Sequence, residues 1–192
     1  MPKQLWKPST LLYPVPAVLV SSKGKEGPPN VLTVAWTGTV CSEPPMLSIS
    51  VRPERYSHAL ITQSGEFVVN LPTKKLIRAV DLCGVKSGKD MDKFAAAGLT
   101  PAPSSVVKAP IIEECPVNIE CRVTQAIPLG SHDMFIGEIV TVHVEGELMD
   151  KKGHLDLARA NLIAWVHGHY AEIGKMMGYF GFSVRKRGRR KA

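Results

Sequence analysis

The feature that most constrains this chain is a series of seven short runs of β-forming residues, separated by Gly and Pro. The runs lie at residues 17–22, 30–40, 46–52, 66–71, 117–127, 135–146 and 160–167. Short strands divided by turn residues predict a mainly β fold of the barrel or sandwich kind. The first two runs flank a Gly-containing loop and the next pair flanks Pro44 and Pro45, so each pair predicts a hairpin.

Helices are expected to be few and short. Each expected helix begins at a residue that caps helices well and stops before a glycine. The three helices cover 57–64 from Ser57, 73–83 from Thr73 and 90–97 from Asp90. The Pro- and Ser-rich stretch at 98–110 predicts an ordered connection wrapped over the barrel.

At 192 residues, the chain has the length of one domain with a sizeable core. Its composition, 44% hydrophobic and 21% charged, is typical of a soluble globular protein. No apolar run approaches the roughly 20 residues of a membrane-spanning helix, and the proline-broken N-terminus does not resemble a secretory signal. We therefore expect a cytoplasmic protein. Four cysteines without a Cys-x-x-Cys pair predict free thiols rather than a zinc ribbon.

The net charge of +7 is concentrated at one end of the chain. Residues 185–191, RKRGRRK, contribute six positive charges, which leaves 7 − 6 = +1 for the rest. We expect one domain at 1–182 and a basic, flexible tail at 183–192, with little support for nucleic-acid binding by the fold itself. A tail that anchors the protein to RNA or DNA is the alternative, and it predicts binding that weakens steeply with salt.

The second run, NVLTVAWTGTVCS, has two unlike faces because side chains alternate along a strand. One face carries the larger apolar residues and is expected to pack in the core: Leu32, Val34, Trp36 and Val40. The other carries small or hydroxyl-bearing residues: Thr33, Ala35, Thr37, Thr39 and Cys41. The next run repeats this pattern with Ser48 and Ser50. A face of small side chains that also contains Gly38 suits a flat phosphorylated ligand.

An anion site is predicted where the third run leads into the first helix. Four polar residues surround this helix start: Arg52, Arg55, Ser57 and His58. The unpaired N–H groups and partial positive charge of a helix N-terminus favour anions, and the guanidinium fork matches phosphate oxygens. The alternative interpretation is that Ser57 simply caps the helix and that the arginines are solvated.

Other signatures are incomplete. GVKSGKD at 84–90 resembles a phosphate loop, but only three residues separate its glycines, and Asp90 stands where Ser or Thr would hold magnesium. No Gly-x-Gly-x-x-Gly follows a strand, which argues against a Rossmann fold. His167 and His169 are spaced to share a strand face, but the sequence implies no third metal ligand, so packing or substrate contact is favoured over a metal site.

Four blocks, in their order and spacing, resemble the flavin reductase-like FMN-binding split-barrel family, which includes flavoredoxins and related ferric reductases. The blocks are NVLTVAWTGTVCSEPPMLSISVRPERYSHALI, GEFVVNLP, DLCGVKSGKDMDKF and GSHDMFIGEIV, and the resemblance runs from about residue 12 to residue 180. It implies a six-stranded antiparallel Greek-key barrel with short flanking helices. It also implies a homodimer, with FMN held without a covalent bond near the subunit interface.

The resemblance gives roles to residues already singled out. The flavin ring and ribityl chain would lie along the strand residues Thr33, Ala35, Trp36, Thr37 and Gly38. The phosphate would be received by Val51, Arg52, Arg55, Ser57 and His58, and Ser50 is also expected to contact the cofactor. Lys89 would contact phosphate or an incoming nicotinamide. Cys41 and His132 are expected to flank the exposed ring, although Cys41 fits a buried structural residue equally well.

The resemblance also implies the chemistry. NAD(P)H would deliver a hydride to FMN, and the electrons would pass to a free flavin, a ferric complex or a redox-protein partner. The alternative is an electron carrier of the flavoredoxin type, which exchanges electrons with proteins without oxidising a nicotinamide.

Overall fold

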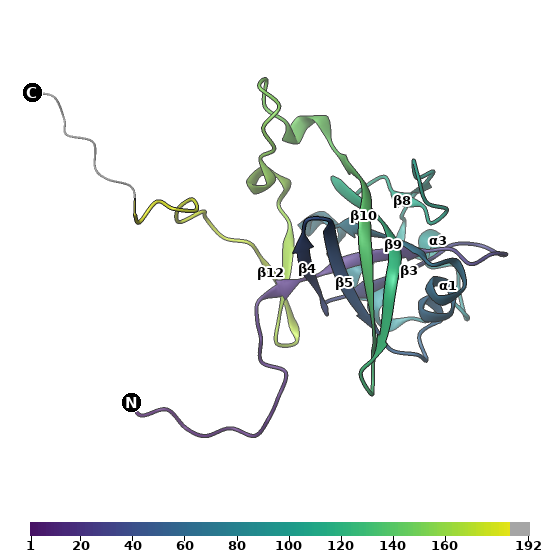
Figure 1. Cartoon of the computed structure of the whole chain (residues 1–192), viewed down its shortest axis with the longest axis horizontal. Helices are drawn as coiled ribbons and strands as arrows, with labels where there is room; N and C mark the ends of the chain where they lie inside the picture. The colour runs from purple at the N-terminus through teal and green to yellow at the C-terminus, as the bar shows by residue number, and fades with distance from the viewer. Residues whose placement is uncertain (185–192) are drawn as a thin grey trace, which may run out of the picture.

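The computed structural model describes residues 1–184 and consists mainly of antiparallel strands (Figure 1). Its main sheet has seven strands in the order β3-β2-β6-β9-β10-β5-β4. Their bounds are β2 (Val18–Ser22), β3 (Asn30–Val34), β4 (Thr37–Ser42), β5 (Pro45–Val51), β6 (Glu66–Leu71), β9 (Val117–Pro128) and β10 (Asp133–Val144). The sheet curls into a half barrel, so the mainly β split-barrel prediction is confirmed. The expected number of six strands is wrong, because residues 30–42 form two strands rather than one.

A bend at Ala35 and Trp36 makes this division. It places β3 at one edge of the main sheet and β4 at the other, so consecutive residues supply both edges. The backbone N–H of Ser50, on β5, donates to the carbonyl of Trp36 at 2.8 Å and ties the bend to the β4 side of the sheet. Leu32 and Val34 pack in the core as expected. Two residues do not: Trp36 is only partly buried at the bend, and Val40 is 51% exposed on an edge strand.

The two predicted hairpins are confirmed. Strands β2 and β3 pair antiparallel with Ser22 opposite Asn30, and β4 and β5 pair with Ser42 opposite Pro45. The predicted strand at 160–167 is shorter, because residues Leu157–Ala160 form a 3₁₀ helix, η3, and Asn161 is left-handed with φ 52°. Only β11 (Ile163–Val166) remains, and it lies between β1 (Val15–Pro16) and β12 (His169–Glu172) in a three-stranded sheet.

The turn between β11 and β12 contains His167, whose φ is 42°. It separates His167 from His169, so these two residues do not share a strand face. Among residues 1–184, no group of three or more His, Cys, Asp or Glu is arranged to hold a metal ion. The four cysteines are free thiols, as predicted.

Three α-helices lie within the described residues, as predicted, but none begins at the predicted residue. Helix α1 (Tyr56–Ser64) ends at Gly65 with φ 70°, but Arg55 is its N-cap and Ser57 lies inside the first turn. Thr73 caps η1 (Lys74–Leu76), which leads into α2 (Ile77–Val85), and α2 continues past Gly84 instead of stopping before it. Asp92, not Asp90, caps α3 (Lys93–Ala97) by accepting from two backbone N–H groups.

Two apolar clusters hold these elements together. Inside the barrel, buried side chains come from every main-sheet strand except β4, with Phe67 and Phe135 as the largest. Gly137 is required there, because a Cβ at this position would lie 2.7 Å from the ring of Phe67. The opposite face of β2 and β3 packs against α2 and α3 through Leu19, Val31 and their helical partners. Strands β2 and β3 are therefore buried on both faces and belong to both apolar clusters.

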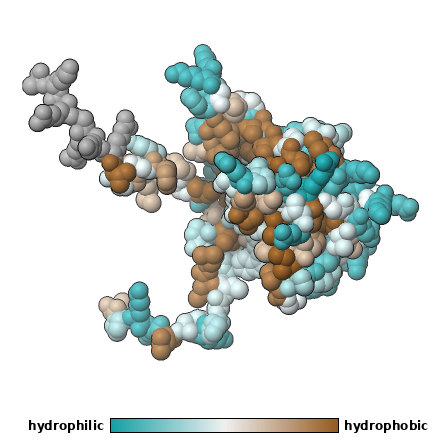
Figure 2. All heavy atoms as spheres, in the orientation of Figure 1, coloured by the Kyte–Doolittle hydropathy of each residue, from teal (hydrophilic) through white to brown (hydrophobic). Residues whose placement is uncertain are grey.

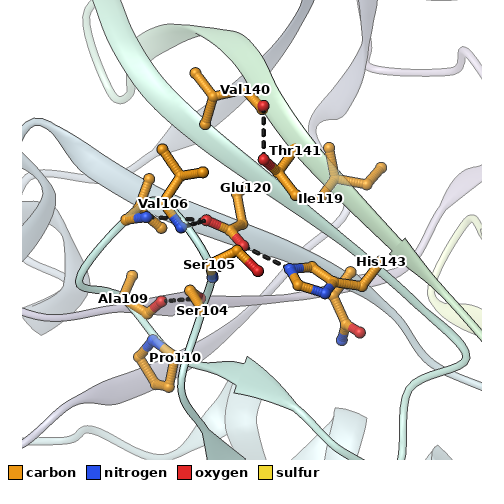
Figure 3. Close-up of polar contacts among 12 residues, drawn as sticks. Ser104, Ser105, Val106, Ala109, Pro110, Ile119, Glu120, Val140, Thr141 and His143 are labelled. Carbon is orange, nitrogen blue, oxygen red and sulfur yellow. Dashed lines mark hydrogen bonds and ion pairs between the residues drawn. The ribbon is translucent and has the colours of Figure 1, made fainter.

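The segment at 98–110 covers the outside of the sheet as expected, and a buried carboxylate holds it there (Figure 3). It contains β7 (Pro101–Ala102), which pairs with β8 (Ile111–Ile112). Glu120, on β9, is fully buried and accepts from the backbone N–H groups of Ser105 and Val106 at 2.7 Å and of Val107 at 2.9 Å. On its other side the carboxylate contacts Nε2 of His143 at 2.5 Å.

The two ends of the described chain run away from the sheets (Figure 1). Both carry apolar side chains in the open, including Trp6, which is 73% exposed, and Phe180, which is fully exposed (Figure 2). No helix within residues 1–184 is long and apolar enough to cross a membrane. The basic stretch 185–191 of the predicted tail lies outside the described residues, and the boundary at 182, like the cytoplasmic location, stays a prediction.

We predict that Glu120→Gln lowers the free energy of unfolding by about 2 to 4 kcal/mol at pH 7, since an amide cannot accept from all four donors. Burial raises the pKa of Glu120, but the hydrogen bonds from His143 and the loop outweigh it and hold the pKa below its ordinary value. The stabilisation is therefore present above the unfolded pKa near 4.3 and is lost as the pH falls through the folded pKa.

Urea unfolding between pH 7 and pH 3 measures this difference. The gap between the wild type and the Gln variant should narrow as the pH falls below about 4. Glu138→Gln, at an exposed position on β10, is the matched control and should change stability by less than about 0.5 kcal/mol. A gap that stays constant over this pH range would contradict the role given to Glu120.

Candidate functional site

A cavity of about 220 Å³ lies where the bend meets the end of β5 and the β11–β12 hairpin. Eight of the predicted site residues line it: Thr33, Ala35, Trp36, Ser50, Val51, Arg52, Arg55 and His132. Leu32, Val34 and Trp165 complete the lining. The structure thus gathers residues from four separate parts of the sequence around the bend, where the chain passes from one edge of the main sheet to the other.

A second cavity, of about 530 Å³, continues along β4. It shares Ala35, Trp36 and Ser50 with the first, and Thr37 and Gly38 extend it. Residues 9–12 of the N-terminal segment form its other wall. We call the two cavities together the bend groove. No protein atom lies within 4 Å of the position that a Cβ of Gly38 would occupy, so the groove is open beside this residue.

The small residues of the bend groove contribute space for a ligand, because the hydroxyl groups of Thr33 and Thr37 already donate within the protein. The hydroxyl of Thr33 donates to the carbonyl of Val80 on α2, and that of Thr37 donates to the carbonyl of Ser48 at 2.8 Å. Neither hydroxyl proton is therefore free to be donated to a ligand. A ligand in the groove would therefore meet backbone groups and small side chains along β3 and β4.

Charge and proton-binding groups gather at the β5 end of the groove. Arg55 is partly buried before α1, whereas Arg52 is exposed and its Nη1 lies 3.3 Å from Oε1 of Glu54. Burial and the positive charge of Arg52 lower the pKa of His132 below its ordinary value. His132 is consequently neutral near pH 7 and can accept a proton.

Four predicted site residues line neither cavity of the bend groove. Ser57 is buried and its hydroxyl accepts from the side-chain amide of Asn30 at 2.8 Å. Nε2 of His58 lies 2.8 Å from Oδ2 of Asp133, and the imidazole packs edge-on against Phe135. Lys89 is exposed in the loop between α2 and α3. Cys41 is near the far end of β4, where its thiol donates to the carbonyl of Glu43 at 3.4 Å.

The residue that sequence reasoning missed is Lys93. Its side chain is only 2% exposed, and its Nζ donates to the carbonyl of Cys83 at 2.8 Å. No carboxylate within residues 1–184 pairs with it. Burial, with a smaller contribution from the charge of Arg55, lowers the pKa of Lys93 to about 8 against the opposing influence of Cys83. A buried lysine is usually paired with an acidic group, whereas the partner of Lys93 within the described residues is a neutral carbonyl.

The surroundings of Lys93 tie it to the predicted anion site. The charge of Arg55, at the N-cap of α1, reaches Lys93. Close by, Gly88 packs on Asn30, the partner of Ser57, so tightly that a Cβ would lie 2.1 Å from Oδ1 of Asn30. The loop at 86–92 is thereby closed over the start of α1. Two cations and the amide end of a nine-residue helix make this end of the site electropositive.

A curled antiparallel sheet with a groove along its opening defines the chain as a split-barrel protein. Residues 10–174 match the sequence profile described as "Flavin reductase like domain", and the chain belongs to this family. An uncharacterized protein of Archaeoglobus fulgidus is 39% identical over 131 residues, which cover 68% of this chain and 73% of that protein.

Solved structures agree with this membership. Flavoredoxin of Desulfovibrio vulgaris is 32% identical, with a TM-score of 0.89 over 95% of this chain and 100% of that one. Nitrilotriacetate monooxygenase component B from Bacillus cereus is 27% identical, with a TM-score of 0.80 over 88% of each chain. The chain is thus similar both to a flavoredoxin and to a component of an oxygenase.

We predict that Lys93→Met raises the free energy of unfolding of the ligand-free protein by about 1 to 3 kcal/mol at pH 7, because the apolar side chain removes a buried charge. The folded pKa of about 8 is below the unfolded value, so the cost of the charge is present below pH 8. It disappears as the pH rises towards about 10.4, the ordinary lysine pKa.

Chemical unfolding at pH 7 and at pH 10 measures this effect, which should be smaller at the higher pH. Lys89→Met makes the same change at an exposed position and serves as the matched control. A Lys93 variant that is less stable than the wild type at both pH values would show that the lysine contributes more to packing than its charge costs.

Proposed function

We propose that the chain is an FMN-binding oxidoreductase that takes electrons from NAD(P)H. The observation that carries this proposal is the buried, carboxylate-free Lys93 beside Arg55, near one end of an open groove of small residues. A single phosphate group satisfies two cations and a helix N-terminus. The family membership, the likeness to a flavoredoxin and the likeness to a monooxygenase component support a flavin as the group that carries this phosphate.

The residues present fit FMN. Arg55, which lines the smaller cavity, would hold the phosphate, and the charge of the buried Lys93 behind it would add to the attraction. The small side chains from Ala35 to Gly38 leave room for a flat ring against the backbone. Trp36 and Trp165 supply aromatic surface at the bend. The groove comprises a cavity of about 530 Å³ and a smaller one, and typical sites for a ligand of this size measure roughly 300 to 1,000 Å³.

The bound flavin supplies the acceptance and release of a pair of electrons, and the protein has only to bind and orient it. Trp36 and Trp165 would shield part of the bound ring from water. His132, kept neutral by its surroundings, is able to accept a proton at the mouth. NAD(P)H would supply a hydride and leave as NAD(P)⁺, and a free flavin, a ferric complex or a redox protein would be the final acceptor of the electrons.

A second candidate function is that of an electron carrier without nicotinamide oxidation. The likeness to the flavoredoxin, at 32% identity and a TM-score of 0.89, favours it. In that case the same groove holds FMN, and a redox protein serves as both donor and acceptor.

The homodimer stays a prediction and is part of this proposal. Strand β4 supports it, since an edge strand without any charged residue and with Val40 exposed is suited to being covered by a second copy.

We predict that Arg55→Ala and Lys93→Met each weaken FMN binding by about 1.5 to 3 kcal/mol, the range for hydrogen bonds to charged groups. Arg52→Ala should cost less, because Arg52 is exposed and already paired with Glu54. Quenching of flavin fluorescence in a titration measures these affinities, with Lys89→Met as the control. If Lys93→Met binds FMN as the wild type does while folding normally, Lys93 is not a phosphate ligand.

Anaerobic mixing of the FMN-loaded protein with NADH or NADPH tests the electron donor. We expect at least one of them to bleach the visible flavin absorbance within seconds, and the oxidised nicotinamide to appear in equal amount. Bleaching by dithionite alone, with neither nicotinamide active, would reject the reductase and leave the electron carrier.

A further inference from the structure

A side cavity of about 240 Å³ opens beside the bend groove. Thr33, Ala35 and Trp165 line both spaces, so the side cavity directly adjoins the bend groove. The far side of the side cavity is formed by α2 through Asp81 and Gly84, and by Tyr170 on β12. None of these last three residues takes part in the proposed binding of FMN.

The side cavity combines an aromatic surface with one acidic group. The rings of Trp165 and Tyr170 meet edge to face, with centroids 4.9 Å apart. The hydroxyl of Tyr170 donates to Oδ1 of Asp81 at 3.4 Å, a long contact that leaves most of the capacity of this carboxylate to accept hydrogen bonds unused. Within residues 1–184, Asp81 forms no ion pair.

The state of Tyr170 fits a hydrogen-bond donor. Burial and the neighbouring charge of Asp81 raise the pKa of Tyr170 to about 12. The phenol therefore remains protonated at any physiological pH. Its proton is directed to Asp81, so the carboxylate oxygens are the acceptors that the side cavity offers to a ligand.

Size decides what the side cavity holds. At about 240 Å³ it is smaller than the roughly 300 to 1,000 Å³ that whole small-molecule ligands occupy. Because it adjoins the bend groove, it is suited to one part of a ligand whose other part lies against the flavin. A carboxylate that accepts from the vicinal diol is a common means of holding the adenosine ribose of NADH, and it repels the 2′-phosphate that this same ribose carries in NADPH.

We infer that the side cavity binds the adenosine ribose of the nicotinamide donor and that Asp81 makes the protein prefer NADH to NADPH. The inference rests on the proposed reductase function and adds the identity of the donor to it. Asp81 acts in substrate selection, with Tyr170 as a second hydrogen-bonding group, and neither is needed to retain FMN.

The test compares wild type, Asp81→Asn and Tyr170→Phe, all loaded with FMN, in anaerobic stopped-flow reduction by NADH and by NADPH. Asp81→Asn should raise the half-saturating concentration of NADH about tenfold, the effect of losing a hydrogen bond to a charged group. The same change should lower that of NADPH, because the repulsion is removed. Tyr170→Phe, which keeps the ring against Trp165, should weaken both donors to a similar, smaller extent.

Glu138→Gln, an exposed change of equal charge away from both cavities, should leave the kinetics and the FMN content unchanged. Normal reduction by NADH with an unaltered preference in Asp81→Asn would overturn the inference and leave the reductase function intact. A wild type that prefers NADPH would also overturn it. Failure of both nicotinamides to reduce the wild type would instead reject the proposed function itself.

Discussion

The hydrogen bond from the Ser50 N–H to the Trp36 carbonyl is the contact on which this architecture depends. Strands β3 and β4 are consecutive in the chain yet occupy opposite edges of a seven-stranded sheet. The chain between these strands therefore has to pass from one edge of the curled sheet to the other, and this bond fixes the bend where it does so. Trp36 and Ser50 line both cavities of the bend groove, so the bond that shapes the fold also shapes the site.

The sequence predicts the elements of this fold better than their connection. Alternation and turn residues locate β2, β5, β6, β9 and β10 closely, because local propensity decides them. The bend at Ala35 and Trp36 escapes prediction because neither residue breaks a strand, and only the distant bond to Ser50 divides the run. The prediction for Val40 is wrong for a related reason. The bend places it on the edge strand β4, where no further strand of the main sheet covers it.

The candidate site divides in a similar way. The small face of the strand pair predicts the groove correctly in position, since size is a local property of residues such as Ala35 and Gly38. It does not reveal that the hydroxyls of Thr33 and Thr37 are engaged by backbone carbonyls. The local sequence does not reveal the burial of Lys93 either. A lysine is expected at the surface, and only the packing of α3 brings its Nζ to the carbonyl of Cys83. Burial depends on tertiary structure, and the lowered pKa of Lys93 depends on burial.

The residues shared by the bend groove and the side cavity have an evolutionary consequence. Thr33 and Ala35 line both spaces, so a larger side chain at either position would crowd two ligands at once. Related chains are therefore expected to diversify through α2, whose Asp81 and Gly84 line the side cavity and not the bend groove. The shared positions should vary little in volume, whatever electron donor a given member uses.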